Sequence, residues 1–446
     1  MQNEIKKTYG LTNAITMIVG SVIGSGIYFK ADDILMFTGG KLWLGIVLIV
    51  FGALVIVFGS LALAQLTQRS SQAGGIASYI GDFVSPALAT GVGAYQAFVY
   101  FPIFTVIVSW VGSAYTWSIF NPNASLEAKI ALTFVYMSGI VAINYLSKKL
   151  AGQFQSAATF IKVIPLVIIA IVGFFWSKDL PIVPQGIKVI EPFDNGWGWL
   201  ASLVPLAFTY DGWTVAATIA PEVKNPRRNL PLAYTLGPLA IVFIYVVYFW
   251  GLNEILGETF ILSTGNVAIQ YAAQMILGKG FASAIIFCVI VSVMGVADGM
   301  YLAAQRLPQA MAERQWIQSP RLAKLHPKYQ VSTASTLLTY GLTIFWLGIH
   351  YLVEKYQWLP GSDICESAVV FNSICLLPLF YATYRLHKQG EIKSAFFGIV
   401  CPLLATFGII ILVVGSIVLN WKVALLTMTM SVIFVVYFIR LYQKNH

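Results

Sequence analysis

Apolar stretches of about 20 residues recur along almost the whole chain, and they restrict the folds that it can adopt. A helix of this length spans a hydrocarbon core of about 30 Å. Only 10% of the 446 residues are charged, and these fall mainly in short bursts between the apolar stretches. Soluble domains usually contain about 25% charged residues. The sequence therefore predicts an all-α integral membrane protein that crosses the bilayer many times.

Hydropathy windows of about 19 residues place twelve transmembrane helices in the chain. With both termini in the cytoplasm, eighteen of the 27 lysines and arginines fall on the inner side and eight on the outer side. The positive-inside rule favours this orientation and an even number of spans. No long polar linker separates two halves, so we expect a single domain over residues 1–446. The expected spans lie near residues 11–37, 41–66, 87–119, 127–146, 153–176, 199–220, 231–253, 281–305, 332–353, 365–386, 395–419 and 423–441.

Several other classes of protein are disfavoured. The polar N-terminus leads directly into an apolar stretch without a cleavage site, so no removable signal peptide is expected. The four cysteines show neither disulfide nor zinc spacing, and the net charge of +9 comes from basic loops rather than a nucleic-acid surface. The sequence contains no ATP-binding loop and no H-E-x-x-H motif. We expect no enzymatic activity, cofactor, metal, nucleic acid or obligatory protein partner. We expect the lipid bilayer to surround the helices.

The first expected span contains three glycines and two serines at membrane depth, within residues 18–27. Glycine costs about 1 kcal/mol in a helix interior. One interpretation is close helix packing, because Gly20 and Gly24 form a G-x-x-x-G pair. The other is that the helix unwinds at Gly24-Ser25-Gly26. Free backbone amides at the start of the second half-helix would then favour an anion such as a carboxylate.

The sixth expected span carries an acid and a glycine in mid-membrane, Asp211 and Gly212. An Asp at a helix centre costs about 2.5–3.5 kcal/mol, so it is a functional candidate, although it could simply hydrogen-bond unwound backbone. Spans one and six each begin a group of five helices. Because five is odd, the second group must be inverted relative to the first. We expect a five-plus-five inverted repeat of residues 11–176 and 199–386, with discontinuous helices 1 and 6, followed by two extra helices over 395–441.

Two helices unwound at one depth would form a site for the invariant part of an amino acid. Free amides near Ser25 and Gly26 would bind the α-carboxylate, and free carbonyls of Val22, Phe208 and Asp211 would bind the α-ammonium. The aromatic side chains of the sixth span would line the wall for the substrate side chain, although packing is the other interpretation. The expected substrate-binding residues are Val22, Ile23, Gly24, Ser25, Gly26, Phe208, Tyr210, Asp211 and Gly212.

Lys162 is the one lysine or arginine near the middle of an expected span. A basic residue at this depth is a functional candidate. We expect its ammonium to contact carbonyls of unwound helix 1 and a hydroxyl of the eighth span such as Ser292. A fixed positive charge there would make a sodium ion unnecessary. Buried lysines can also lose their proton, which leaves proton coupling open.

Four further polar residues lie in or next to expected spans, and the sequence does not decide the roles of two of them, Asp298 and Tyr245. Asp298, embedded in the eighth span, could pair with Lys162, help bind a cationic side chain or cap a local irregularity. Asp363 and Glu366 flank the start of the tenth span and are expected to be interfacial. Tyr245 could face the site, or it could pack against lipid and neighbouring helices.

Three segments together resemble the amino acid–polyamine–organocation superfamily: Gly24-Ser25-Gly26-Ile27, Tyr210-Asp211-Gly212-Trp213, and the loop from Pro221-Glu222 to Pro231. Over nearly the whole chain the sequence looks most like bacterial members of its L-amino acid transporter group, such as serine/threonine or alanine/serine exchangers. The resemblance implies the same inverted-repeat fold and the same carboxylate and ammonium contacts. It also implies that Lys162 replaces a sodium ion bound in related architectures.

The function that this resemblance implies is secondary transport of amino acids by alternating access. Sodium-independent exchange, or facilitated uptake, of small neutral L-amino acids across the plasma membrane is the leading hypothesis. The alternatives are a proton-coupled symporter, an exchanger of cationic amino acids or amines, and, from another class, a channel or membrane enzyme. Arginine/agmatine exchangers carry V-E-S-A where this chain has Trp213-Thr214-Val215-Ala216, which disfavours arginine. Many members of the group have Asn at the position of Asp298.

Overall fold

The computed structural model describes residues 10–70, 75–191, 196–215, 223–329, 331–359 and 363–446. Across these ranges the regular elements are helices and none is a β-strand. The Pro221-Glu222 part of the loop after the sixth expected span lies outside the described residues.

The first part of the chain folds into ten α-helices and one π-helical turn among the described residues. The first expected span corresponds to three of these helices rather than one. The elements are α1 (Leu11–Val22), α2 (Ser25–Phe29), α3 (Ala31–Phe37), α4 (Leu42–Gly52), α5 (Leu54–Thr67), α6 (Gly75–Phe83), α7 (Pro86–Tyr95), η1 (Gln96–Tyr100), α8 (Phe101–Phe120), α9 (Leu126–Leu146) and α10 (Lys148–Phe174).

The second part begins with a short 3-10 helix and continues with α-helices of very different lengths. The longest, α20, contains a non-helical residue, Asn420 (φ −157°, ψ 91°), which divides it into two helical segments. The elements are η2 (Gly196–Ser202), α11 (Leu203–Tyr210), α12 (Pro226–Leu256), α13 (Glu258–Thr264), η4 (Gly265–Val267), α14 (Ala268–Leu277), α15 (Lys279–Glu313), α16 (Pro320–Ala323), α17 (Thr333–Tyr356), α18 (Ile364–Ile374), α19 (Leu377–Lys388), η5 (Phe396–Val400) and α20 (Cys401–Asn445).

Nine helical segments of the described residues are long and apolar enough to cross a membrane. The bilayer core offers no water to backbone groups, so each apolar stretch must satisfy its own hydrogen bonds as a helix. The segments are Leu42–Thr67, Pro86–Phe120, Leu126–Leu146, Ala157–Phe174, Pro226–Leu256, Ala282–Glu313, Thr333–Tyr356, Ile364–Lys388 and Phe396–Asn445. The first expected span is missing from this set because its helices are interrupted and short. In the sixth, α11 is short and residues 216–220 lie outside the described part of the chain.

Polar caps mark the ends of several of these helices. Ser125 accepts a hydrogen bond from the Ala128 amide at the start of α9, at 3.2 Å. Asp363 accepts hydrogen bonds from the amides of Cys365 and Glu366 at the start of α18, at 2.8 and 3.0 Å. Each cap satisfies amides that have no partner within the first helical turn.

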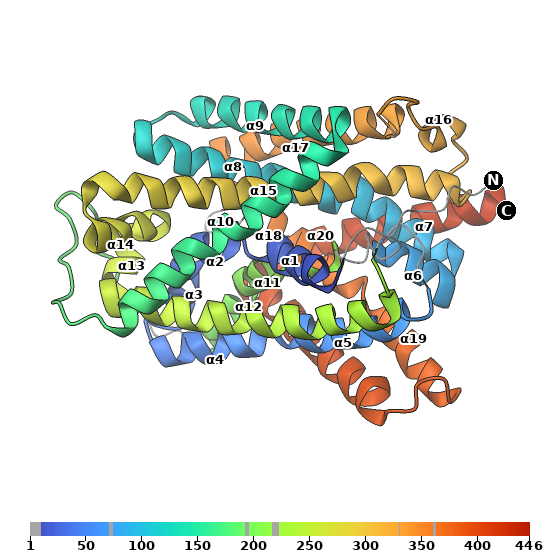
Figure 1. The fold of residues 1–446 in the computed structure, drawn as a ribbon, viewed down its shortest axis with the longest axis horizontal. Coiled ribbons are helices and arrows are strands. Elements are labelled where there is room, and N and C mark those ends of the chain that lie inside the picture. Colours follow the sequence, from blue (N-terminus) through green and yellow to red (C-terminus); the bar gives the residue numbers. More distant parts are fainter. Residues whose placement is uncertain (1–9, 71–74, 192–195, 216–222, 330, 360–362) are drawn as a thin grey trace.

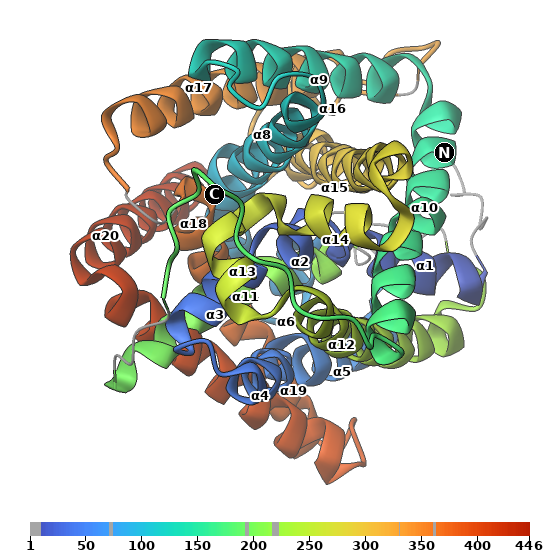
Figure 2. The same ribbon diagram turned by 90° about the vertical axis from the view of Figure 1, so that its left-hand side faces the viewer.

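The helices are arranged as a bundle around the short interrupted ones. α15 packs along α8 and α10, α12 packs along α1, α5 and α10, and α20 packs along α5 and α7. The end-on view of Figure 2 shows α2 and α11 in the middle of this bundle, while α9, α17 and α20 lie at its edge. In Figure 1 the C-terminus lies at one end of the long helices, and α13 and α14 lie at the other. The fold therefore surrounds both helix interruptions with protein.

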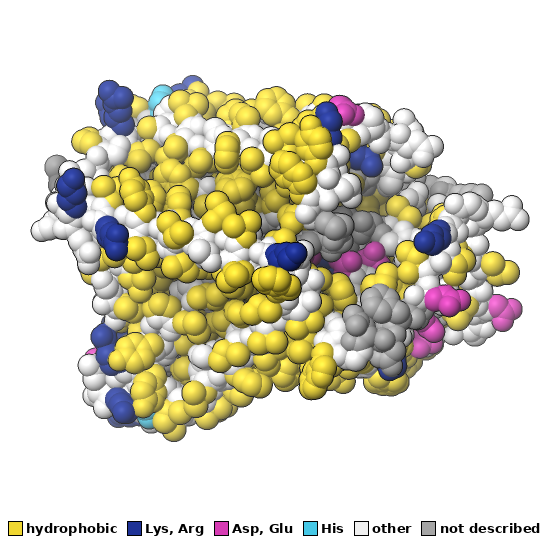
Figure 3. Space-filling model, turned by 180° about the vertical axis from the view of Figure 1, so that it is seen from behind, with side chains coloured by type: hydrophobic (Ala, Val, Ile, Leu, Met, Phe, Trp, Pro, Cys, Tyr) yellow, Lys and Arg dark blue, Asp and Glu magenta, His cyan; other side chains and the backbone are white. Residues whose placement is uncertain are grey.

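The outer helices expose large apolar side chains. Examples are Phe134 on α9, Phe345 on α17, and Leu403 and Ile433 on α20. Figure 3 shows hydrophobic side chains covering much of the face seen there, with lysines and arginines distributed around them. Soluble proteins rarely expose apolar patches of this extent. The surface therefore matches a hydrocarbon environment.

One backbone contact gives a test of this packing. A Cβ atom added to Gly251 of α12 would lie 2.7 Å from the Ile169 carbonyl oxygen and 3.0 Å from the Ala170 Cα of α10. We expect Gly251→Ala to force α10 and α12 apart and to destabilise the protein by about 1–3 kcal/mol, the usual cost of overpacking.

Gly341 in α17 is the matched control, because nothing lies within 4 Å of its added Cβ. There the better helix propensity of alanine should leave stability unchanged or raise it by up to about 1 kcal/mol. Thermal unfolding of both variants in detergent measures the difference. Equal melting temperatures would contradict the close α10–α12 contact.

Candidate functional site

The first helix interruption lies between α1 and α2. α1 ends at Val22, Ile23 is extended (φ −67°, ψ 108°) and Gly24 is also non-helical (φ −160°, ψ −136°). Ser25 and Gly26 are the first two residues of α2. The interruption expected at Gly24-Ser25-Gly26 is therefore present but begins one residue earlier. The amides of Ser25 and Gly26 belong to the first turn of the second half-helix, and the side chain of Ser25 lies outside the described atoms.

The second interruption follows α11 and adjoins the first. Asp211 is extended, and Gly212 has φ +100°, a conformation that side-chain-bearing residues rarely adopt. A Cβ on Gly212 would lie 2.5 Å from the Ser21 carbonyl oxygen of α1. A Cβ on Gly26 would lie 2.5 Å from the Thr209 Cα of α11. Glycine at both positions therefore lets the two interrupted helices touch through their backbones.

A tyrosine of α12 joins the carbonyls of the two interrupted helices. The Tyr245 hydroxyl lies within hydrogen-bond distance of the Val22 carbonyl (3.2 Å) and the Thr209 carbonyl (3.0 Å). The Phe208 carbonyl accepts a hydrogen bond from the Asp211 amide at 3.2 Å. The expected ammonium-binding carbonyls of Val22 and Phe208 thus already have donors. Each carbonyl oxygen carries a second lone pair that a further donor can use.

The carboxylate of Asp211 is fully engaged. Its Oδ2 accepts a hydrogen bond from the Tyr100 hydroxyl at 2.6 Å, and its Oδ1 accepts one from the Gly212 amide at 2.8 Å. Asp211 is buried. The carboxylate therefore holds the second interruption open and links it to η1. Tyr100 had no role in the sequence prediction, because an interior tyrosine in an apolar stretch gives no signal of its partner.

The aromatic residues of α11 face different neighbours. Phe208 is buried and stacks on Phe104 of α8, with ring centres 5.1 Å apart. The Tyr210 hydroxyl donates to the Ile49 carbonyl of α4 at 2.8 Å, and its ring lies against Tyr245. Phe208 therefore lies between the interruptions and α8. Tyr210 instead bonds to α4, which differs from its expected place in the wall.

Lys162 of α10 contacts both halves of the first interrupted helix. Its fully buried ammonium donates to the Gly20 carbonyl of α1, and its own carbonyl accepts a hydrogen bond from the Tyr28 hydroxyl of α2 at 2.6 Å. The expected contact with a helix 1 carbonyl is present. The expected contact with Ser292 is not made: the Ser292 hydroxyl is buried and has no hydrogen-bond partner among the described residues. Lys162 therefore joins α1, α2 and α10.

Asp298 of α15 pairs with an amide rather than with Lys162. Its Oδ1 accepts a hydrogen bond from Asn144 Nδ2 of α9 at 2.6 Å. Two buried oxygens of this pair, Asp298 Oδ2 and Asn144 Oδ1, have no partner within the described part of the chain. The possible ion pair between Asp298 and Lys162 is therefore not formed. Asn144 lies near the end of an expected span and gave no sequence signal.

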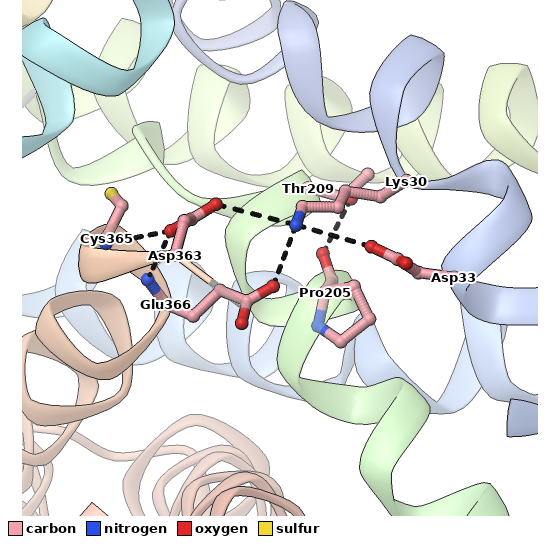
Figure 4. Close-up of polar contacts among 7 residues, drawn as sticks. All are labelled: Lys30, Asp33, Pro205, Thr209, Asp363, Cys365 and Glu366. Atoms are coloured by element: carbon pink, nitrogen blue, oxygen red, sulfur yellow. Dashed lines mark hydrogen bonds and ion pairs between the residues drawn. The ribbon is translucent and has the colours of Figure 1, made fainter. Parts of the chain in front are cut away.

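A buried ionic cluster lies beside Phe208. Figure 4 shows the Lys30 ammonium between three carboxylates, at 2.8 Å from Glu366, 3.3 Å from Asp33 and 3.5 Å from Asp363. Lys30 and Glu366 are 4% and 2% exposed. Asp363 and Glu366, which we expected at the membrane interface, both join a cluster that ties the end of α2 to the start of α18.

The sequence contained only part of the signal for this cluster. Lys30 lies inside the first expected span, 11–37, and no neighbouring motif indicates its partners. Its partner Glu366 is 336 residues away along the chain. The residues that the structure describes include no group of three His, Cys, Asp or Glu placed to hold a metal ion.

Known proteins resemble this chain along most of its length. The profile of a family described as "Amino acid permease" matches residues 9–441. The serine/threonine exchanger SteT of Bacillus subtilis (strain 168) is 27% identical, over 87% of this chain and 85% of that protein. The b(0,+)-type amino acid transporter 1 of Mus musculus is 25% identical, over 99% and 89%. The Asc-type amino acid transporter 1 of Mus musculus is 25% identical, over 87% and 73%.

Proposed function

We propose that this chain, which belongs to the amino acid permease family, exchanges small neutral L-amino acids across the plasma membrane by alternating access and without sodium. Its family makes it a multi-pass membrane transporter of amino acids, within the amino acid–polyamine–organocation superfamily, and not an enzyme. Its relatives include L-amino acid transporter members. Substrate, coupling and orientation are the parts that we propose.

The proposed architecture is twelve spans in a five-plus-five inverted repeat with two extra helices. Nine described segments are long enough to span a bilayer, and Asn420 divides the last of them into two. The interrupted helices α1–α3 and η2–α11 supply the other two spans. The repeats would cover residues 11–176 and 199–386, and the extra helices 395–441. An even number of spans places both termini on the same side, which the lysine and arginine distribution assigns to the cytoplasm.

The proposed substrate site is the junction of the two interruptions, and the backbone contact between them is the observation that carries this proposal. The α-carboxylate would bind the amides of Ser25 and Gly26, at the positive end of α2 and α3. The α-ammonium would bind the carbonyls of Val22, Phe208 and Asp211, partly in place of the Tyr245 hydroxyl. The helices packed around both interruptions enclose the proposed site. Alternating access requires that such helices open it to one side of the membrane at a time.

The environment of two charged residues supports neutral substrates and sodium independence. Each oxygen of Asp211 already accepts one hydrogen bond from the protein, and we infer that this orientation keeps the carboxylate from pairing with a cationic substrate. Lys162 donates a hydrogen bond to the Gly20 carbonyl, and we infer that it takes the place of a sodium ion there. Exchange agrees with the name of one relative, a serine/threonine exchanger.

Transport by the purified protein in liposomes tests this proposal. We expect labelled serine or alanine to enter vesicles only when they contain unlabelled amino acid, at the same rate in sodium and in potassium buffer. A failure to take up any amino acid, or uptake that requires sodium, would contradict the proposal.

Lys162→Ala provides the accompanying variant. Because Lys162 joins both halves of the interrupted helix to α10, its loss should reduce turnover about tenfold, or roughly 1.4 kcal/mol of barrier, more than it weakens apparent affinity. Lys188→Ala, at an exposed lysine, is the control. Unchanged turnover in Lys162→Ala would remove this residue from the mechanism.

One observation favours proton-coupled uptake as a second function. Asp298 Oδ2 and Asn144 Oδ1 are both hydrogen-bond acceptors, both buried, and both without a partner among the described residues. A proton on Asp298 Oδ2 would convert it into a donor for Asn144 Oδ1, while Asn144 Nδ2 still donates to Asp298 Oδ1. A protonated acid and an amide would then form a doubly hydrogen-bonded neutral pair between α9 and α15.

Asp298→Asn tests this second function, because it keeps the shape of the side chain but cannot bind the proton. An inward proton gradient should accelerate uptake into vesicles that contain no amino acid, and the variant should lose this acceleration while still exchanging. Wild-type uptake at the same rate with and without the gradient would exclude proton coupling. If the gradient still accelerates uptake by Asp298→Asn, the coupled proton binds to a group other than Asp298.

A further inference from the structure

An acidic cavity of about 350 Å³ lies at the end of α17, next to the start of α3, α9 and α18. We call it the α17 cavity. It contains four carboxylates against two lysines, together with a histidine and a tryptophan. It reaches exposed surface at Gln357. Its lining residues are Lys30, Asp32, Asp33, Ile107, Trp110, Ala114, Lys129, His350, Val353, Glu354, Gln357, Leu359 and Asp363.

The carboxyl groups that line this cavity outnumber its lysines, four to two. Lys30 is already surrounded by Asp33, Asp363 and Glu366, as Figure 4 shows. Lys129 is the one other basic residue of the lining, against Asp32 and Glu354. Carboxyl groups that outnumber the lysines of a confined, partly buried space favour a cation as its occupant.

His350 supplies a second, independent observation. It is 1% exposed and lines the cavity, and both of its ring nitrogens lack a hydrogen-bond partner among the described residues. Its ring packs edge-on against Trp110, with ring centres 4.9 Å apart. A polar group that is buried without a hydrogen-bond partner destabilises the fold. A neutral imidazole always keeps one nitrogen as an acceptor, so an N–H donor in the cavity would satisfy it.

The size of the cavity and the positions of its acids decide which cation fits. No three of the described His, Cys, Asp and Glu side chains are placed to hold a metal ion. The volume of about 350 Å³ lies at the lower end for small-molecule pockets. An alkylammonium ion has N–H donors for the histidine and the carboxylates, and an apolar stem for Trp110, Ile107 and Val353. The carboxyl groups of the lining exclude an anion. The apolar lining, and the lack of three metal ligands among the described residues, disfavour a compact inorganic ion.

We propose that the α17 cavity binds a small primary alkylammonium ion, held by Glu354, Asp32 and His350 and distinct from the ligand at the helix interruptions. Lys30 separates the two places: its ammonium lies 5.9 Å from the centre of the Phe208 ring, while two of its three carboxylate partners, Asp33 and Asp363, line the cavity. The proposal does not depend on which amino acid the protein transports.

Titration calorimetry on the purified full-length protein with n-propylammonium chloride tests this site. We expect saturable binding that sodium chloride at equal ionic strength does not reproduce. Tetraethylammonium, which has no N–H donor, should bind far more weakly. Glu354→Gln should weaken propylammonium binding about tenfold, as expected for loss of a charge-assisted hydrogen bond. Glu254→Gln, at an exposed glutamate, is the matched control and should bind like the wild type.

Three further measurements test this proposal and separate it from the proposed function. His350→Phe keeps the ring packing on Trp110 and should also weaken binding, while Glu354→Gln should keep wild-type serine exchange. Saturating serine should leave propylammonium binding unchanged. Competition by serine would place the amine at the helix interruptions and overturn the proposal. Absence of saturable binding, or unchanged affinity in both variants, would overturn it as well.

Discussion

The backbone contact between the two interrupted helices is the constraint on which the rest of the structure depends. Gly212 approaches the Ser21 carbonyl, and Gly26 approaches the Thr209 backbone, closer than any side chain would allow. Hydrocarbon cannot satisfy the backbone groups that such interruptions release. The protein therefore has to enclose them, which it does with α8, α10, α12 and α15.

Side chains from three of the surrounding elements satisfy the released groups. Tyr245 of α12 bonds to carbonyls on both interrupted helices, Lys162 of α10 bonds to α1, and Tyr100 of η1 bonds to Asp211. Each bond crosses from an interrupted helix to a continuous one. In the transport cycle that we propose, movement of one group of helices against the other would remake these bonds, which makes the same residues candidates for its control.

The sequence predicted the features that depend on local composition. Glycine clusters and the embedded Asp211 located both interruptions, because Gly and Asp are costly in a membrane helix and so mark where it fails. The same reasoning located Lys162 and its contact with helix 1. The hydropathy windows located the continuous spans for the same reason, since length and apolarity are properties of one segment.

Contacts between distant segments could not be predicted in this way. Lys30 and Glu366 lie near span ends, where hydropathy does not distinguish an interfacial charge from a buried ion pair, and only the fold brings them to 2.8 Å. Asn144 and His350 are single polar residues in apolar helices, and neither forms a motif with its neighbours in sequence. Whether each side chain has a hydrogen-bond partner among the described residues depends on the packing of α9, α15 and α17.

The central claim is that an amino acid binds where the two interrupted helices meet. An experimental structure of the protein with its best-transported amino acid tests this most directly. The account predicts ligand density between residues 22–26 and 208–212, with the carboxylate at the amides of Ser25 and Gly26 and the ammonium at the Val22 carbonyl. Substrate density confined to another part of the bundle, with the Tyr245 hydroxyl still bonded to both carbonyls, would contradict it.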